Sequence, residues 1–121
     1  MVTFACVLFE GVAGRVPGYS RGYYSPVWVD RLFYGLQQNV PVSLGPHGVG
    51  WRLICLTDTF YRFESPVERI PLSRPAGWFS LLEPMAHVTA GEQLITLGLD
   101  SVVAGDLAEL VEYRGEFGWL R

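Results

Sequence analysis

Val2–Phe9 reads VTFACVLF, a continuous apolar run that contains β-branched and aromatic residues. Strands with one solvated face alternate apolar and polar residues, whereas strands of a parallel sheet are buried on both faces and have no such alternation. We therefore expect Val2–Phe9 to be a buried strand. Trp51–Leu56 (WRLICL) has a similar character and predicts a second buried strand.

A helix is predicted between these two strands, after a glycine-containing loop. Ser25 is a residue type that caps helix N-termini, and Pro26 suits the first helical position. The residues with the spacing of one apolar helix face are Val29, Leu32, Phe33 and Leu36. We expect this helix to end near Gln38, before Pro41.

Three further short segments have the composition of strands. Val67–Pro71 and Gln93–Leu97 predict the third and fourth strands, and Phe117–Leu120 is expected to begin one more. Glu10–Tyr24 and Ser43–Gly50 contain several glycines and are predicted to be loops.

Two more helices are predicted in the second half of the chain. Gly77–Met85 carries apolar residues at helical spacing, and Pro84 is expected to cut that helix short or to kink it. A short helix is expected after Gly105, where Asp106 and Glu109 form a capping arrangement. The resulting order β-α-β-β-α-β-α-β predicts an α/β fold, a mostly parallel open sheet with helices on both faces, in which residues 1–121 form a single domain.

Composition excludes some classes of partner. The chain has 121 residues, of which 50% are hydrophobic and 17% are charged, and its net charge is −3. There is no run of Lys or Arg, so we expect no nucleic-acid partner. No apolar run approaches the roughly 18 residues of a membrane span. The apolar surplus predicts that some apolar surface remains for a protein partner.

The N-terminal residues and the two cysteines bear on location. Met1–Phe9 has no positive leader and is followed by Glu10, unlike a signal peptide, so we expect a cytoplasmic protein. Cys6 and Cys55 both lie inside predicted strands and are expected to be buried, reduced thiols.

The C-terminal quarter of the chain carries a recognisable order of motifs. Within Gly91–Arg121, Leu99–Val103 reads LDSVV and is followed by Gly105-Asp106-Leu107. This order resembles the donor-site region of GT-A glycosyltransferases, in which a strand ending in an Asp-x-Asp motif precedes an apolar strand and a Gly-Asp-Leu that opens a short helix. The resemblance implies a truncated GT-A (Rossmann-like) nucleotide-diphospho-sugar transferase fold.

Earlier segments resemble the same family in the same order. Val7–Phe9 is similar to the first strand, whose end receives the nucleotide base, and Leu53–Asp58 is similar to the second strand with its terminal Thr-Asp. Gly77–Phe79 and Glu83 resemble the helix before the metal motif. The resemblance therefore covers nearly the whole chain.

This sequence departs from the family at three points. The first aspartate of Asp-x-Asp corresponds to Gly98, and a lysine that the family often carries in the Trp helix corresponds to Leu81. The chain also has about half the length of the family's catalytic domain, whose second half supplies the acceptor site and a histidine metal ligand. We therefore expect impaired catalysis or none.

The resemblance and the predicted topology together suggest a donor site. If the first strand lies between the second and the fourth, the strand order reverses between the first and the fourth, where open parallel sheets bind ligands. The residues expected to bind the donor are Phe9, Glu10, Gly11, Tyr19, Asp58, Gly98 and Asp100. The base would stack on Tyr19, Tyr23 or Tyr24, and Asp58 would bond the base or the ribose.

The expected metal is Mn²⁺ or Mg²⁺, because the family uses such an ion to bridge the two phosphates of the donor. Hard cations of this kind take several oxygen ligands. Asp100 supplies one carboxylate, whereas Gly98 offers at most a backbone oxygen. We therefore expect Asp100 to bind a metal only weakly.

Two functions are compatible with these patterns. One is a domain derived from a nucleotide-sugar-dependent sugar transferase, which binds a nucleotide sugar but is truncated. The alternative is a non-catalytic structural or interaction protein, such as an assembly or virion component, that reuses the fold. In that case we expect a homo-oligomer or a larger protein assembly, because surface normally covered by the missing half needs a cover.

Overall fold

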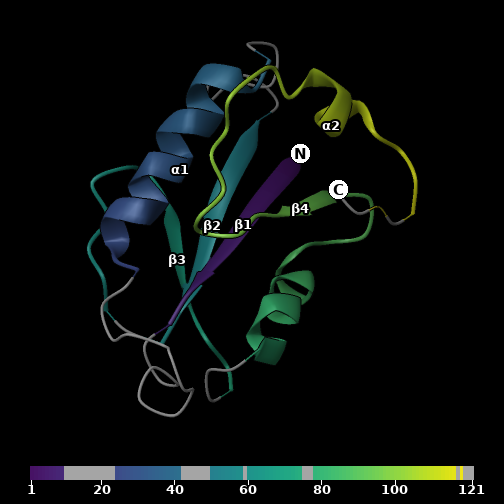
Figure 1. Cartoon of the computed structure of the whole chain (residues 1–121). Helices are drawn as coiled ribbons and strands as arrows, with labels where there is room; N and C mark the ends of the chain where they lie inside the picture. Colours follow the sequence, from purple (N-terminus) through teal and green to yellow (C-terminus); the bar gives the residue numbers. More distant parts are fainter. Residues whose placement is uncertain (10–23, 42–49, 59, 75–77, 117, 119–121) are drawn as a thin grey trace.

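The computed structural model describes residues 1–9, 24–41, 50–58, 60–74, 78–116 and 118 (Figure 1). Two of the predicted loops fall mainly on residues outside this set, as does the strand predicted at Phe117–Leu120.

Four parallel strands form one sheet, in the order β3-β2-β1-β4 (Figure 1). The strands are β1 (Val2–Leu8), β2 (Trp51–Thr57), β3 (Glu68–Pro71) and β4 (Gln93–Thr96). The prediction of a parallel α/β sheet is confirmed, and the strand ends differ from the predicted ones by one residue. Every residue of β1 is buried, as its continuous apolar sequence predicts.

One face of the sheet packs against α1 (Pro26–Asn39) and α2 (Ala108–Glu112). Side chains of alternate residues of β1 and β2 point to this face, because successive side chains of a strand point to opposite sides. The four residues predicted to form the apolar face of α1 are all buried there. We call this side the α1 face; its buried cluster also includes Phe4, Leu53 and Val111.

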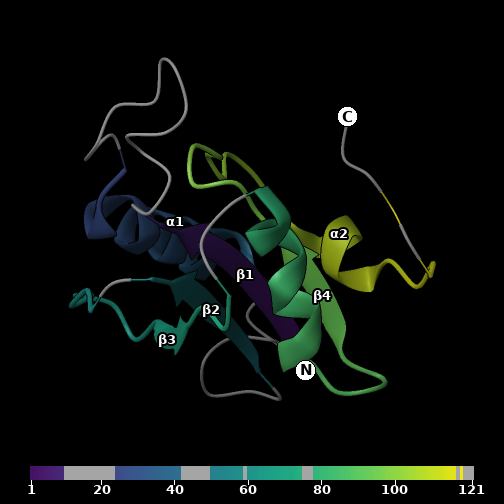
Figure 2. The same ribbon diagram turned by 90° about the horizontal axis from the view of Figure 1, so that it is seen from below.

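The other face packs against a 3-10 helix, η2 (Trp78–His87), which lies against β1 and β4 (Figure 2). Ala5, Val7, Ile54 and Leu56 form the buried cluster on this side, which we call the η2 face. Helices therefore cover both faces, as predicted. Among the described residues, the buried hydrophobic cluster is much smaller here than on the α1 face.

The expectation that Pro84 cuts this helix short was wrong. This residue was expected to shorten or kink a helix, but η2 continues through Pro84 to His87. The helix is of the 3-10 type, in which side chains three residues apart are aligned. Pro84 is buried, whereas Leu81, Leu82 and Met85, three of the apolar residues with helical spacing, are 43–63% exposed.

The chain crosses the α1 face after β4 and then runs beside α1 to reach α2 (Figure 1). Val103 lies so close to Gly35 that a Cβ on this glycine would be 3.1 Å from the valine Cβ. The backbone N–H of Leu107 donates to the carbonyl of Asn39, 3.0 Å away, at the end of α1. This segment, residues 97–107, therefore completes the cover of the α1 face.

The helix caps differ in detail from the expected ones. Ser25 occupies the N-cap position of α1, but its side chain makes no capping hydrogen bond. At α2 the N-cap is Leu107, while Asp106 Oδ1 accepts a hydrogen bond of 2.9 Å from the N–H of Ala108. Asp106, the predicted cap, therefore serves the first turn of α2 from one residue before the observed N-cap.

Cys6 and Cys55 lie opposite each other in the register of β1 and β2, and both are free and buried. This confirms the prediction of buried thiols. Hydrogen bonding with Cys55 raises the pKa of the Cys6 thiol well above its usual value, and burial acts in the same direction. Cys6 is therefore a poor nucleophile at neutral pH.

Candidate functional site

The strand order places a switch point where it was predicted, between β1 and β4. The chain passes from β1 outward to β2 and β3, and then returns to β4 on the other side of β1. Asp58 follows β2 at the same edge and is exposed, while Phe9 follows β1 and is half-buried. Glu10, Gly11 and Tyr19 lie outside the described residues, and so does Tyr23.

The strands at this switch point end at different levels. Thr96, the last residue of β4, is paired with Ala5, and the N–H of Leu97 donates to the carbonyl of Ala5 at 2.8 Å. Phe9 comes four residues after Ala5, which corresponds to about 13 Å along a strand. The chain therefore leaves β4 well before β1 ends.

A tight turn at residues 98–101 follows, closed by a 3.0 Å hydrogen bond from the N–H of Ser101 to the carbonyl of Gly98. Asp100 lies in this turn and is exposed. A Cβ at position 98 would be 3.0 Å from Asp100 Oδ1, tighter than most contacts of a real Cβ. The carboxylate of Asp100 thus occupies space that a side chain at position 98 would need.

Phe9 and the turn at residues 98–101 lie on different faces of the sheet. Leu97 and Leu99 pack against the cluster on the α1 face, whereas Phe9 packs against the cluster on the η2 face. The expectation that strand ends alone would bring Phe9 close to Asp100 did not take this into account. The assignment of both residues to a donor site stays a prediction.

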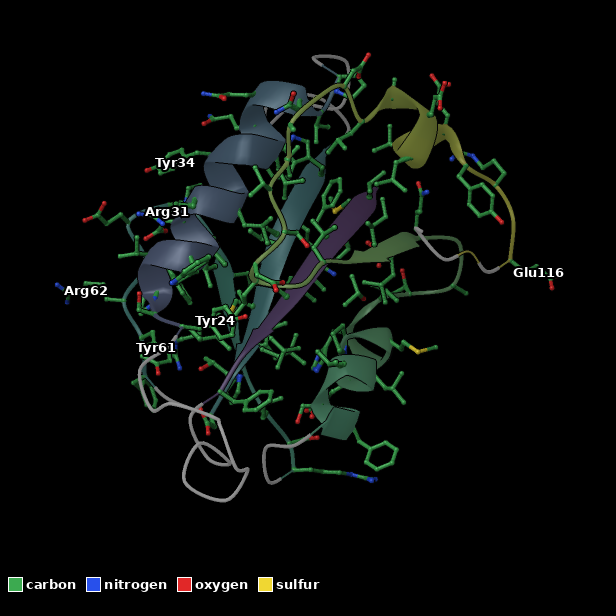
Figure 3. The ribbon with its side chains drawn as sticks, viewed as in Figure 1. Tyr24, Arg31, Tyr34, Tyr61, Arg62 and Glu116 are labelled. Atoms are coloured by element: carbon green, nitrogen blue, oxygen red, sulfur yellow. The ribbon has the colours of Figure 1, made fainter. Side chains whose placement is uncertain are left out.

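Tyr24, one of three candidates for stacking on a base, packs against the α1-face cluster. Its ring meets that of Trp28 edge to face, with 5.4 Å between the centroids. Arg31 lies 5.7 Å from the centroid of the Trp28 ring, in cation–π contact. Arg31 lies on the side of α1 away from the sheet, whereas Tyr24 and Tyr61 lie near the start of this helix (Figure 3).

The prediction of a manganese or magnesium ion stays untested. Among the described residues, no group of three or more His, Cys, Asp or Glu side chains is arranged to hold a metal ion. Asp100, the metal ligand predicted from the sequence, lies in the described part of the chain.

Asp30 was not singled out from the sequence, although it connects α1 to residues 64 and 65, which lie between β2 and β3. Asp30 Oδ2 accepts a hydrogen bond from the Glu64 N–H at 3.2 Å, and Oδ1 accepts one from the Ser65 N–H at 2.9 Å. The Ser65 hydroxyl also donates to Oδ1. The carboxylate is buried, so these donors replace water around it. The sequence feature that could have indicated this role is an acidic residue beside the apolar face of the predicted helix.

Arg52 was also missed, and it ties η2 to the sheet. Its Nε donates to Thr3 Oγ1 at 3.0 Å, and Nη2 donates to the carbonyl of His87, the last residue of η2, at 3.0 Å. Nη1 forms a 3.1 Å ion pair with Glu68 on β3. One guanidinium thus links β1, β3 and η2, because its five donors point in fixed directions.

The outward side of η2 carries three aligned apolar side chains, which we call the apolar row. Phe79, Leu82 and Met85 are 86%, 60% and 63% exposed. They are aligned because their spacing of three matches the repeat of a 3-10 helix. Isolated exposed apolar residues are common, but adjacent ones indicate a contact surface.

An open depression of about 360 Å³ lies at the opposite edge of the sheet, where β1, β2 and β4 begin. Gln93 contributes to its wall, and its amide nitrogen donates to the carbonyls of Leu110 and Tyr113. The Gln93 Oε1 atom is buried and has no hydrogen-bond partner among the described residues. Because this is the amino-terminal edge, it is not where open parallel sheets usually bind ligands.

Within the described residues, no helix has both the length and the apolar character needed to cross a membrane. The predicted cytoplasmic location stays a prediction. A scan against protein-family models, a search of curated proteins and a search of solved structures each found no match for this chain. The GT-A resemblance therefore stands as a hypothesis based on the motifs themselves.

Proposed function

We propose that the chain binds a nucleoside diphosphate sugar at the carboxyl edge of its sheet, as a GT-A-like donor-binding domain with impaired catalysis or none. The observation that supports this most is the strand order β3-β2-β1-β4, with all strands parallel. It creates a switch point beside β1, the strand whose end follows the family pattern. Ligands of open α/β sheets bind at such points.

The proposed roles follow the order of the chain. Phe9 to Gly11, Tyr19 and Asp58 hold the nucleoside, and Asp100 faces the diphosphate through a divalent cation. Binding by this domain is weak, because Phe9 and the Gly98–Ser101 turn lie on different faces of the sheet. Metal assistance is also weak, since Gly98 brings no second carboxylate and its space is taken by Asp100.

Calorimetric titration with UDP-, GDP- and TDP-sugars, with and without Mn²⁺, tests the proposal. We expect one nucleotide to bind with a Kd on the order of 0.1–1 mM, about −4 to −5.5 kcal/mol. Mn²⁺ should tighten binding less than about tenfold, because a single carboxylate holds hard cations poorly. Asp58→Ala should weaken binding about tenfold, the effect expected from one lost hydrogen bond to a polar ligand group.

Asp106→Ala is the matched control. Asp106 is also an exposed aspartate, but it serves α2, near the end of α1 and away from the switch point. Its substitution should leave nucleotide binding unchanged. If no nucleotide sugar produces heat at millimolar concentration, the proposal is wrong. A tightening by Mn²⁺ of about 100-fold that Asp100→Ala abolishes would contradict weak metal assistance instead.

A second candidate function is a non-catalytic role in assembly, which the apolar row on η2 favours. Phe79, Leu82 and Met85 expose apolar surface to water. Burying this surface against another molecule would be favourable in free energy. This role does not need a nucleotide. Light scattering, which measures the mass of the particle in solution, separates an assembling chain from a solitary one.

A further inference from the structure

We propose that two copies of this chain associate about a two-fold axis through the free edge of β4 and the apolar row of η2. The inference deepens the assembly role proposed above and is independent of nucleotide binding. Its occupant is a second copy of the same chain because both surfaces are self-complementary, as a two-fold interface requires.

The first surface is the backbone of β4. The N–H of Gln93 donates to the carbonyl of Met1, just before β1, at 3.4 Å, and the N–H of Leu97 donates to that of Ala5 in β1 at 2.8 Å. Because N–H and C=O groups of alternate residues point to the same side of a strand, Leu94 and Thr96 direct theirs outward. Among the described residues, no strand pairs with β4 on that side. An antiparallel copy of β4 would satisfy these groups in both chains.

The second surface adjoins the first. The helix η2 contacts β4, and Leu94 packs into the cluster on the η2 face. The side chain of Thr96 points to the same face, because it is two residues from Leu94, and it is exposed. The apolar row and the strand edge can thus be covered by one neighbouring molecule.

Charge does not oppose contact between identical copies here. The apolar row contains no ionisable side chain, and Glu83 is the only acidic residue within η2. The carboxylate of Glu83 accepts a 2.6 Å hydrogen bond from the N–H of Ser73, outside the row. Two copies of the row can therefore meet without placing like charges opposite each other, which would weaken association.

The area of the row explains why both surfaces are needed. An aromatic side chain presents about 150–250 Å², so the row, with one aromatic and two smaller apolar side chains partly exposed, offers roughly 400 Å² per copy. A specific interface buries at least about 1,000 Å² in total, more than two rows supply. The paired β4 edges and their side chains would contribute the remainder.

Sedimentation equilibrium and light scattering of the full chain test the proposal at concentrations on the order of 0.1 mM. We expect a particle of twice the 13.5 kDa mass of one chain. Leu82→Asp should weaken the dimer at least about 100-fold, because it places a charge in the apolar contact. Thr96→Pro should do the same by removing an outward N–H, while the bonds of β4 to β1 remain.

Val102→Asp is the matched control for Leu82→Asp, since Val102 is 86% exposed but lies in the segment that covers the α1 face. Its dimer should be as stable as that of the unchanged chain, and circular dichroism should show all variants folded. A monomeric unchanged chain overturns the proposal, and so does a dimer that Leu82→Asp or Thr96→Pro leaves intact. Nucleotide titration of the same samples shows separately whether donor binding fails.

Discussion

The two faces of the sheet are built from the same strands but are covered very differently. On the α1 face, side chains from β1, β2, β4, α1 and α2 form one buried cluster. On the η2 face, the buried hydrophobic cluster among the described residues consists of Ala5, Val7, Ile54 and Leu56. The stability of the domain therefore depends mainly on the α1 face, while the η2 face leaves apolar surface available for contacts.

The type of helix accounts for this difference. Over its length Pro26–Asn39, α1 places apolar residues on one stripe of a 3.6-residue repeat, and that stripe lies against the sheet. In η2 the apolar residues occupy more than one of the three rows of a 3-10 helix, so one row points away from the sheet. Apolar residues therefore form part of the core in α1, whereas in η2 some of them form exposed surface.

The largest expected effect comes from Leu53 and Leu56, which lie in β2, are at most 1% exposed and point to opposite faces. We expect Leu53→Ala to lower the free energy of unfolding by about 4 kcal/mol and Leu56→Ala by about 2.5 kcal/mol. The smaller value for Leu56→Ala is expected because the cover of the η2 face is thinner and can move into the cavity that the substitution leaves. Urea unfolding of both variants measures the difference. Equal losses would contradict the view that the two faces differ in packing.

A smaller effect is expected from the two side chains that tie the covers to the sheet. Asp30→Ala should lower the free energy of unfolding by about 3 kcal/mol, because the donors of Glu64 and Ser65 lose a charged acceptor. Arg52→Met, which keeps an apolar stem, should lower it by about 1.5 kcal/mol. Hydrogen exchange should show that Arg52→Met loosens η2 and leaves α1 protected.

Two conservative variants serve as controls for these ties. Asp30→Asn keeps an acceptor oxygen for Ser65 and should lose less stability than Asp30→Ala. Glu68→Gln removes only the partly exposed ion pair with Arg52 and should change stability by less than about 0.5 kcal/mol. If Glu68→Gln is as damaging as Arg52→Met, the ion pair and not the bonds to Thr3 and His87 holds η2.

The smallest effect concerns Glu92, just before β4. Hydrogen bonds from the N–H and hydroxyl of Thr89 lower the pKa of the Glu92 carboxyl, and Arg52 acts in the same direction. A lowered folded pKa stabilises the fold above the unfolded value, about 4.3, and this contribution is lost as pH falls through the folded pKa. Urea midpoints of the unchanged chain and Glu92→Gln should therefore converge between pH 7 and pH 3. A constant difference contradicts this.

The sequence was sufficient to predict the sheet and the main helix. Val2–Leu8 and Trp51–Thr57 have continuous apolar patterns that are typical of central parallel strands, and Pro26–Asn39 has both a start signal and a clear periodicity. These patterns are local and agree with the burial that the fold imposes. The apolar spacing in Trp78–His87 was correctly taken as helical, but the type of helix and its exposed row were not predicted.

The candidate site was less predictable than the fold. The position of β1 between β2 and β4 was a condition of the site prediction, and the structure meets it, but the direction in which the chain turns after β4 was not predicted. Packing of Leu97 and Leu99 on the α1 face decides this direction, and such contacts between distant segments leave no periodic pattern in the sequence. The roles of Asp30 and Arg52 were hidden for the same reason, since their partners are 16 to 49 residues away along the chain.

Local patterns of apolar and turn-forming residues were thus enough to establish the strands, the long helix and the parallel α/β class, because strand and helix periodicity depends on near neighbours. Tertiary packing alone decided that residues 97–107 cover the α1 face, that Asp100 lies in a turn above it, and that Phe79, Leu82 and Met85 remain exposed. The physical reason is that these outcomes depend on which distant surfaces bury one another most completely.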